Sequence, residues 1–94
     1  MNDNDTTIAD LRSMMTRFIT ERHWEKFHTP GNLAVSLNVE AGELLELFQW
    51  LTPEDVSARC KEPNFRTALG EEMADVLMYL VSLAVAADID LAAA

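Results

Sequence analysis

The sequence has few basic residues and only one cysteine. Seven lysines and arginines stand against sixteen aspartates and glutamates among 94 residues, so the net charge is −9. This excess of negative charge disfavours a nucleic-acid polymer as a partner, because phosphate backbones bind positively charged surfaces. The single cysteine, Cys60, can form no disulfide within the chain and belongs to no Cys or His cluster. Cysteine usage therefore favours a reducing cytoplasm.

Long apolar runs and strand-like alternation are also lacking. The longest apolar segment, residues 76–87, is about half the ~20 residues that a membrane-spanning helix needs. The N-terminus is polar and acidic, unlike a signal peptide. No run alternates apolar and polar residues over the length of a strand. We therefore expect a cytoplasmic, all-α protein with no membrane partner, and a chain this short suits one domain.

Three stretches carry apolar residues at helical spacing. The pattern predicts helices from residue 6 or 7 to about 25, from after Asn32 to about Leu51, and over about 65–87. Residues 1–7 are expected to form a disordered tail before a single domain over residues 8–94.

Proline and glycine mark the expected breaks. The segment HTPGN, residues 28–32, contains a Pro-Gly pair and is expected to change the chain direction. Thr52 and Pro53 have the residue types of an N-cap and a first helical position, so a short helical turn is expected there. The segment KEPN around Pro63 is expected to be a loop.

The last predicted helix is apolar on nearly all sides. Between residues 76 and 87, only Tyr79 and Ser82 interrupt the apolar residues. A helix without a polar face is buried on several sides, and the other helices of so short a chain cannot cover it. We therefore expect a homodimer or a homotetramer to complete the fold.

Two of the predicted helices carry paired acidic residues. Glu40 and Glu43 share a helix face, as do Asp75 and either Glu71 or Glu72, and the spacing does not choose between these two. If the helices are antiparallel neighbours, the four carboxylates face one another and must take up protons or bind cations. Oxygen ligands without His or Cys favour Mg²⁺, with Mn²⁺ possible. The alternative is that these side chains are simply solvated.

Two longer segments resemble a known family. NVEAGELLELFQW (38–50) and LGEEMADVLMYLVSLA (69–84) resemble the MazG-like, all-α nucleoside triphosphate pyrophosphohydrolases, most of all the branch that acts on dCTP. That branch has a Glu-x-x-Glu pair followed by a Glu-x-x-Asp pair, and here 28 residues separate the two pairs. The resemblance covers about residues 8–91 and selects Glu72 over Glu71.

The resemblance implies a fold, a reaction and a set of site residues. The fold would be a MazG-like helical bundle, and the reaction Mg²⁺-dependent cleavage of dCTP or 5-modified dCTP to the monophosphate and pyrophosphate, which cleans the nucleotide pool. Glu43 is the candidate catalytic base. The implied metal ligands are Glu40, Glu43, Glu72 and Asp75. The residues implied to line the nucleoside site are Trp24, His28, Asn32, Trp50 and Tyr79.

The family pattern continues beyond Ala94 with a further helix and a Lys/Asn-containing segment that helps to hold the phosphates. The C-terminal helix is therefore expected to be truncated. Two other functions stay open on the sequence: a helical oligomerisation or adaptor module, and a nucleotide binder without turnover. Trp24 and Trp50 could equally be core residues, and His28 a loop residue.

Overall fold

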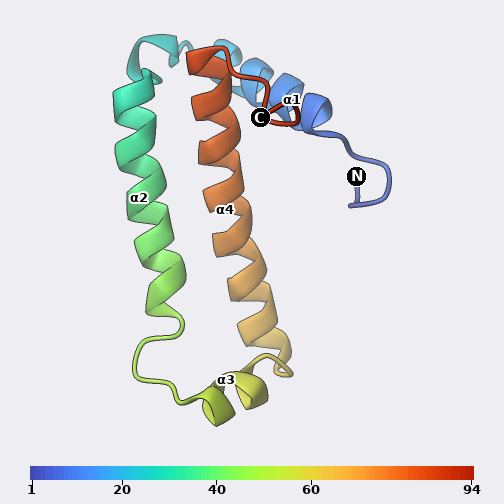
Figure 1. Ribbon diagram of the computed structural model, residues 1–94, viewed down its shortest axis with the longest axis vertical. Coiled ribbons are helices and arrows are strands. Elements are labelled where there is room, and N and C mark those ends of the chain that lie inside the picture. The colour runs from blue at the N-terminus through green and yellow to red at the C-terminus, as the bar shows by residue number, and fades with distance from the viewer.

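A computed structural model describes residues 1–94 as an all-helical chain without strands (Figure 1). Its elements are α1 (Ile8–Glu21), the 3₁₀ helix η1 (Glu25–Phe27), α2 (Pro30–Glu46), α3 (Pro53–Arg59) and α4 (Pro63–Ala87). The all-α class is thereby confirmed. None of the helices combines the length and the hydropathy that crossing a bilayer requires.

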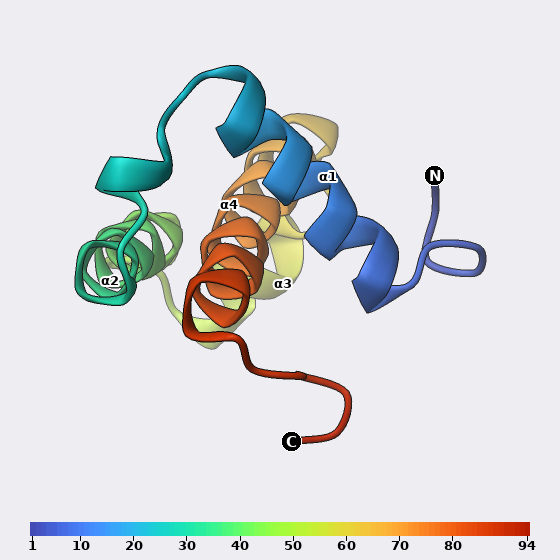
Figure 2. The same ribbon diagram turned by 90° about the horizontal axis from the view of Figure 1, so that it is seen from above.

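The longest helix, α4, lies between two others. Helices α2 and α4 run antiparallel, side by side along the long axis of the molecule (Figure 1). Helix α1 packs on the opposite side of α4, as the view from above shows (Figure 2). Helix α3 lies in the connection between α2 and α4. The antiparallel pair is the arrangement that the face-to-face prediction for the acidic residues required.

Threonine side chains cap the first turns of three helices. Thr7, Thr29 and Thr52 each accept a hydrogen bond from a backbone N–H in the first turn of α1, α2 and α3, respectively. These bonds satisfy N–H groups that have no partner within the helix. The predicted N-cap at Thr52 and the helical turn starting at Pro53 are both confirmed.

Two helices end earlier than the sequence pattern predicts. Helix α1 ends at Glu21 rather than near residue 25, because His23 adopts a left-handed φ of 55° that a helix cannot contain. Helix α2 ends at Glu46 rather than near Leu51. The following residues form turns with hydrogen bonds three residues apart, and the chain then leaves the helical direction at Trp50, whose φ is 69°.

Two helices begin earlier than predicted, at a proline. Helix α2 starts at Pro30 and α4 at Pro63, so KEPN is only partly a loop. The missing N–H of proline is no loss in the first turn, and its fixed φ suits a helix. The chain does change direction before α2, as predicted, but the Pro-Gly pair belongs to the helix.

The single chain buries very little. The buried apolar residues are Ile19, Leu33, Val81 and Ala84. Large apolar side chains on α2 and α4 remain exposed, and those more than half exposed are Val35, Val39, Leu45 and Met73. Exposed apolar surface of this kind is typical of a protein that associates. Assembly into a homo-oligomer stays a prediction.

Candidate functional site

Three glutamates converge between α2 and α4. Glu40 and Glu43 of α2 and Glu72 of α4 each offer a carboxylate oxygen, and these oxygens lie within 4.8 Å of one another. We call these three residues the carboxylate cluster. Glu71, the alternative that the spacing left open, is exposed and lies outside the cluster.

Two oxygens of the carboxylate cluster are buried without a partner. Oε2 of Glu40 and Oε2 of Glu72 are inaccessible and form no hydrogen bond. Burial raises the pKa of both carboxyl groups, and the negative charges of Glu43 and Asp75 raise these pKa values further. No positive charge contributes to either shift, so nothing nearby favours the ionised form of these two carboxyl groups.

This arrangement suits a divalent cation. A carboxylate oxygen removed from water needs a positive or hydrogen-bonding partner, and here two such oxygens lie beside a third carboxylate. Hard oxygen donors without nitrogen or sulfur are the ligands that Mg²⁺ and Mn²⁺ take in proteins. The cluster fits such an ion on its own chemistry.

Asp75 connects the cluster to an adjacent groove. It stands one turn beyond Glu72 on α4, and its charge acts on both Glu40 and Glu72. Asp75 also lines a cavity of about 390 Å³ next to α1, a size within the usual range for small-molecule sites. We call this cavity the aromatic groove. Its lining residues are Met14, Met15, Phe18, Trp24, His28, Asp75, Met78, Tyr79 and Ser82.

Stacked rings form one wall of the aromatic groove. The rings of Trp24 and His28 are nearly parallel, at 17°, with centroids 6.2 Å apart. Phe18 packs edge-on against Trp24 at 5.7 Å, and the guanidinium of Arg22 lies 3.5 Å from the centroid of Phe18. These contacts hold the indole in place through aromatic and cation–π attraction.

Three of the five predicted nucleoside-site residues line the groove: Trp24, His28 and Tyr79. The other two lie elsewhere in the single chain. The amide of Asn32 donates a hydrogen bond of 3.2 Å to the Phe27 carbonyl, which ties η1 to α2. Trp50 is 91% exposed and lies outside the groove. Their contact with a nucleoside stays a prediction.

Sequence reasoning missed five groove residues. Met14, Met15 and Phe18 belong to the apolar stripe of α1, and a stripe at helical spacing gives no sign of whether it faces a core or a cavity. Met78 on α4 is equally inconspicuous. Ser82 did carry a signal, because it is a polar residue in an otherwise apolar stretch.

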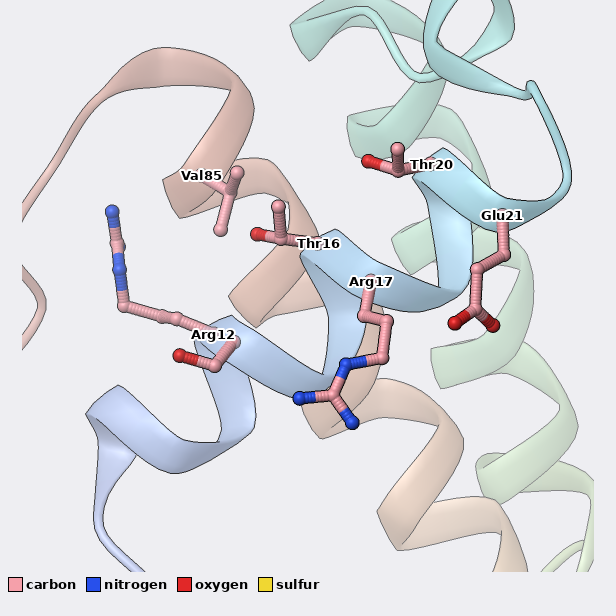
Figure 3. Close-up of a pocket in the computed structure, with 7 residues that line it drawn as sticks. Arg12, Thr16, Arg17, Thr20, Glu21 and Val85 are labelled. Atoms are coloured by element: carbon pink, nitrogen blue, oxygen red, sulfur yellow. The ribbon is translucent and has the colours of Figure 1, made fainter.

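A second hollow lies on the opposite side of α1 from the groove residues Met14 and Phe18. Figure 3 shows Thr16 beside Val85 of α4, whereas Arg17 and Glu21 extend away from it. This hollow is a wide, open surface with a single apolar lining residue, so it lacks the enclosure of a small-molecule site. The carboxylate cluster and the aromatic groove remain the candidate site.

The chain resembles known proteins in both sequence and structure. Residues 35–93, which include both acidic pairs, match the sequence profile of the MazG-like family. The chain belongs to the MazG-like family. It is also similar to a pyrophosphatase of known structure from Archaeoglobus fulgidus. The TM-score is 0.80 and the identity 38%, and the similarity covers 96% of this chain and 82% of that one.

Curated relatives resemble the chain over nearly all of its length. It is 46% identical over 87 residues to dCTP pyrophosphatase 1 of Homo sapiens, covering 93% of this chain and 51% of the relative. It is 44% identical over 88 residues to dCTP pyrophosphatase 1 of Bos taurus, covering 94% of this chain and 52% of the relative. The chain thus spans about half the length of the curated relatives it matches.

The raised pKa values of Glu40 and Glu72 predict a pH dependence of stability. The folded protein holds protons on these groups at pH values where the unfolded chain has released them. The stabilisation is therefore complete below the ordinary pKa of 4.5 and is lost as the pH rises through the raised values.

Urea unfolding of the metal-free protein between pH 4.5 and 8 measures this loss. The Glu40→Gln/Glu72→Gln variant is expected to lose less stability over that range, and equal losses would contradict the prediction.

Proposed function

We propose that this MazG-like protein is a Mg²⁺-dependent nucleoside triphosphate pyrophosphohydrolase of the cytoplasm that cleaves dCTP or a 5-modified dCTP. The products would be the nucleoside monophosphate and pyrophosphate. One observation carries the proposal: a carboxylate cluster with two unpartnered buried oxygens adjoins an aromatic groove through Asp75. The relatives named dCTP pyrophosphatase 1 support the substrate class.

The acidic residues would hold a cation, and one of them would also accept a proton from water. Glu40, Glu43, Glu72 and Asp75 would hold Mg²⁺, which when bound offsets the charge of the triphosphate, polarises the phosphorus–oxygen bond and acidifies water. Glu43 is the exposed member of the carboxylate cluster, whereas Glu40 and Glu72 are half-buried. Among the three residues of the carboxylate cluster, Glu43 is therefore the most accessible to water, which supports Glu43 as the general base.

The aromatic groove would bind the nucleoside. Trp24 and His28 offer ring faces on which a base can stack, and such stacking contributes about 1–3 kcal/mol per base with little base preference. Tyr79 and Asp75 lie one turn apart on α4 and place a hydroxyl and a carboxylate on the same wall. The groove therefore separates an apolar base site from an acidic phosphate site.

A panel of substrates tests the proposed specificity. We expect pyrophosphate release from dCTP and 5-methyl-dCTP to exceed release from dATP, dGTP and dTTP, all measured with Mg²⁺ at equal concentrations. Equal release from all five nucleotides would support the pyrophosphohydrolase activity but contradict the preference for cytosine nucleotides. No release from any of them would contradict the proposed function.

We further propose that the active form is a homodimer or a homotetramer. The exposed apolar residues of α2 and α4 support association, and so does Trp50, whose ring has almost no contact within its own chain. A contact between Trp50 and a bound nucleoside would then come from a neighbouring copy.

Assembly is expected to fail when a charge enters the exposed apolar surface of α2. Val35 is 66% exposed in the single chain, so Val35→Lys should cost little in the monomer, whereas it disfavours an interface that covers this position. Sedimentation velocity should show the wild-type chain as a dimer or tetramer and the variant as the 10.5 kDa monomer. The control Asn4→Lys adds the same charge outside the helices. A monomeric wild type would refute the oligomer.

A further inference from the structure

Two residues that line the aromatic groove each carry a buried polar atom without a hydrogen-bond partner. The hydroxyl oxygen of Ser82 and Nδ1 of His28 are both inaccessible and unpaired, and Ser82 as a whole is only 2% exposed. Both side chains line the aromatic groove and also a neighbouring hollow of about 180 Å³. Buried polar groups in native proteins are nearly always paired. Two unpaired atoms on residues that line the same cavity therefore point to a ligand that pairs them.

Ser82 lies at the far end of the groove from the carboxylate cluster. Asp75, Tyr79 and Ser82 follow one another at four- and three-residue spacing along one face of α4, and all three line the groove. At a rise of 1.5 Å per residue, Ser82 lies about 10 Å along α4 from Asp75. A nucleotide with its phosphates at the cluster therefore has its base towards Ser82 and His28.

We propose that Ser82 determines base specificity, its hydroxyl acting with Nδ1 of His28 to read the hydrogen-bonding edge of the base. This inference rests on the proposed function. A neutral histidine with its proton on Nε2 accepts at Nδ1, and a serine hydroxyl can donate. The pair matches an edge that presents an amino group beside a ring nitrogen acceptor, as cytosine does.

The same pair disfavours thymine. Thymine carries a carbonyl oxygen where cytosine carries its amino group, so two acceptors would meet at Nδ1 of His28. Its ring N–H would also require the Ser82 hydroxyl to accept rather than donate. A site whose buried polar groups are left unpaired by the wrong ligand discriminates strongly against it. Stacking on Trp24 cannot provide this discrimination, because every base has a ring face.

The Ser82→Ala variant of the full chain tests the inference. We expect its kcat/KM for dCTP to fall about 10- to 100-fold, as for loss of one buried hydrogen bond, with a smaller fall for dTTP. The Tm of the ligand-free variant should be unchanged or higher, because a buried hydroxyl without a partner is removed. Ser57→Ala, an exposed serine of α3, is the matched control.

Three outcomes would overturn the inference. An unchanged preference for dCTP over dTTP in Ser82→Ala would do so, while pyrophosphate release by the wild type would leave the proposed function standing. Equal losses for both substrates with a lower Tm would mean that Ser82 serves only in packing.

If the wild type releases no pyrophosphate, the proposed function fails, and calorimetry with dCMP then tests whether Ser82 contributes to base binding. Weaker binding by the variant then supports its role, and equal or absent binding by both proteins refutes it.

Discussion

The Glu43→Gln variant is expected to lose pyrophosphate release by about 10²–10⁴-fold, the usual contribution of a general base. Glutamine keeps the size of the side chain but can neither take a proton from water nor offer a full negative charge to a cation. Because Glu43 raises the pKa of both Glu40 and Glu72, its neutralisation also relieves repulsion. The Tm of the metal-free variant should therefore be unchanged or higher than that of the wild type.

A second glutamate of α2 provides the control for this variant. Glu46→Gln makes the same change of charge one turn along the helix, at an exposed position outside the carboxylate cluster. It should retain nearly all of the wild-type rate in a coupled pyrophosphate assay. If Glu43→Gln were as active as Glu46→Gln, Glu43 would have no catalytic role, and the site would need another base.

Mg²⁺ is expected to raise the Tm of the wild-type chain, because an ion that binds only the folded state stabilises it. At about 100 times the dissociation constant, the stabilisation is about 2.7 kcal/mol. For a chain of this size, that corresponds to a rise in Tm of about 10–20 °C. Differential scanning fluorimetry with Mg²⁺ and with EDTA measures the shift.

Adjacent residues on α4 make this measurement specific. Glu72→Gln removes the negative charge of a cluster carboxylate with a buried, unpartnered oxygen and should abolish most of the shift. Glu71→Gln removes the same charge from the neighbouring exposed position and should keep the shift. Equal shifts in both variants would show that Mg²⁺ binds the acidic surface in general and not the carboxylate cluster.

The sequence pattern predicts the helices of this chain better than it predicts their ends. Apolar spacing reports which residues share a face, so the three long helices could be read directly. The ends depend on single backbone conformations. No pattern in the sequence foretells the left-handed φ of His23 or Trp50. Tryptophan rarely adopts this conformation, and histidine, although it adopts it more often, does so only in a small minority of cases. Pro30 and Pro63 mark helix starts as readily as loops, and only the structure separates the two.

The candidate site divides in the same way. Spacing places the acidic pairs on two helix faces, and the antiparallel packing of α2 and α4 then brings Glu40, Glu43 and Glu72 together. The choice of Glu72 came from family resemblance, because Glu71 fits the spacing equally well. Ser82 stands out in the sequence as a polar residue in an apolar stretch, but its burial and its missing partner are visible only in the structure.

Product analysis of dCTP hydrolysis tests the central claim most directly. The purified chain is incubated with dCTP and either Mg²⁺ or EDTA, and the products are separated by anion-exchange chromatography. The account predicts dCMP and pyrophosphate in equal amounts with Mg²⁺, and unchanged dCTP with EDTA. Unchanged dCTP under both conditions, or formation of dCDP and phosphate, would contradict it.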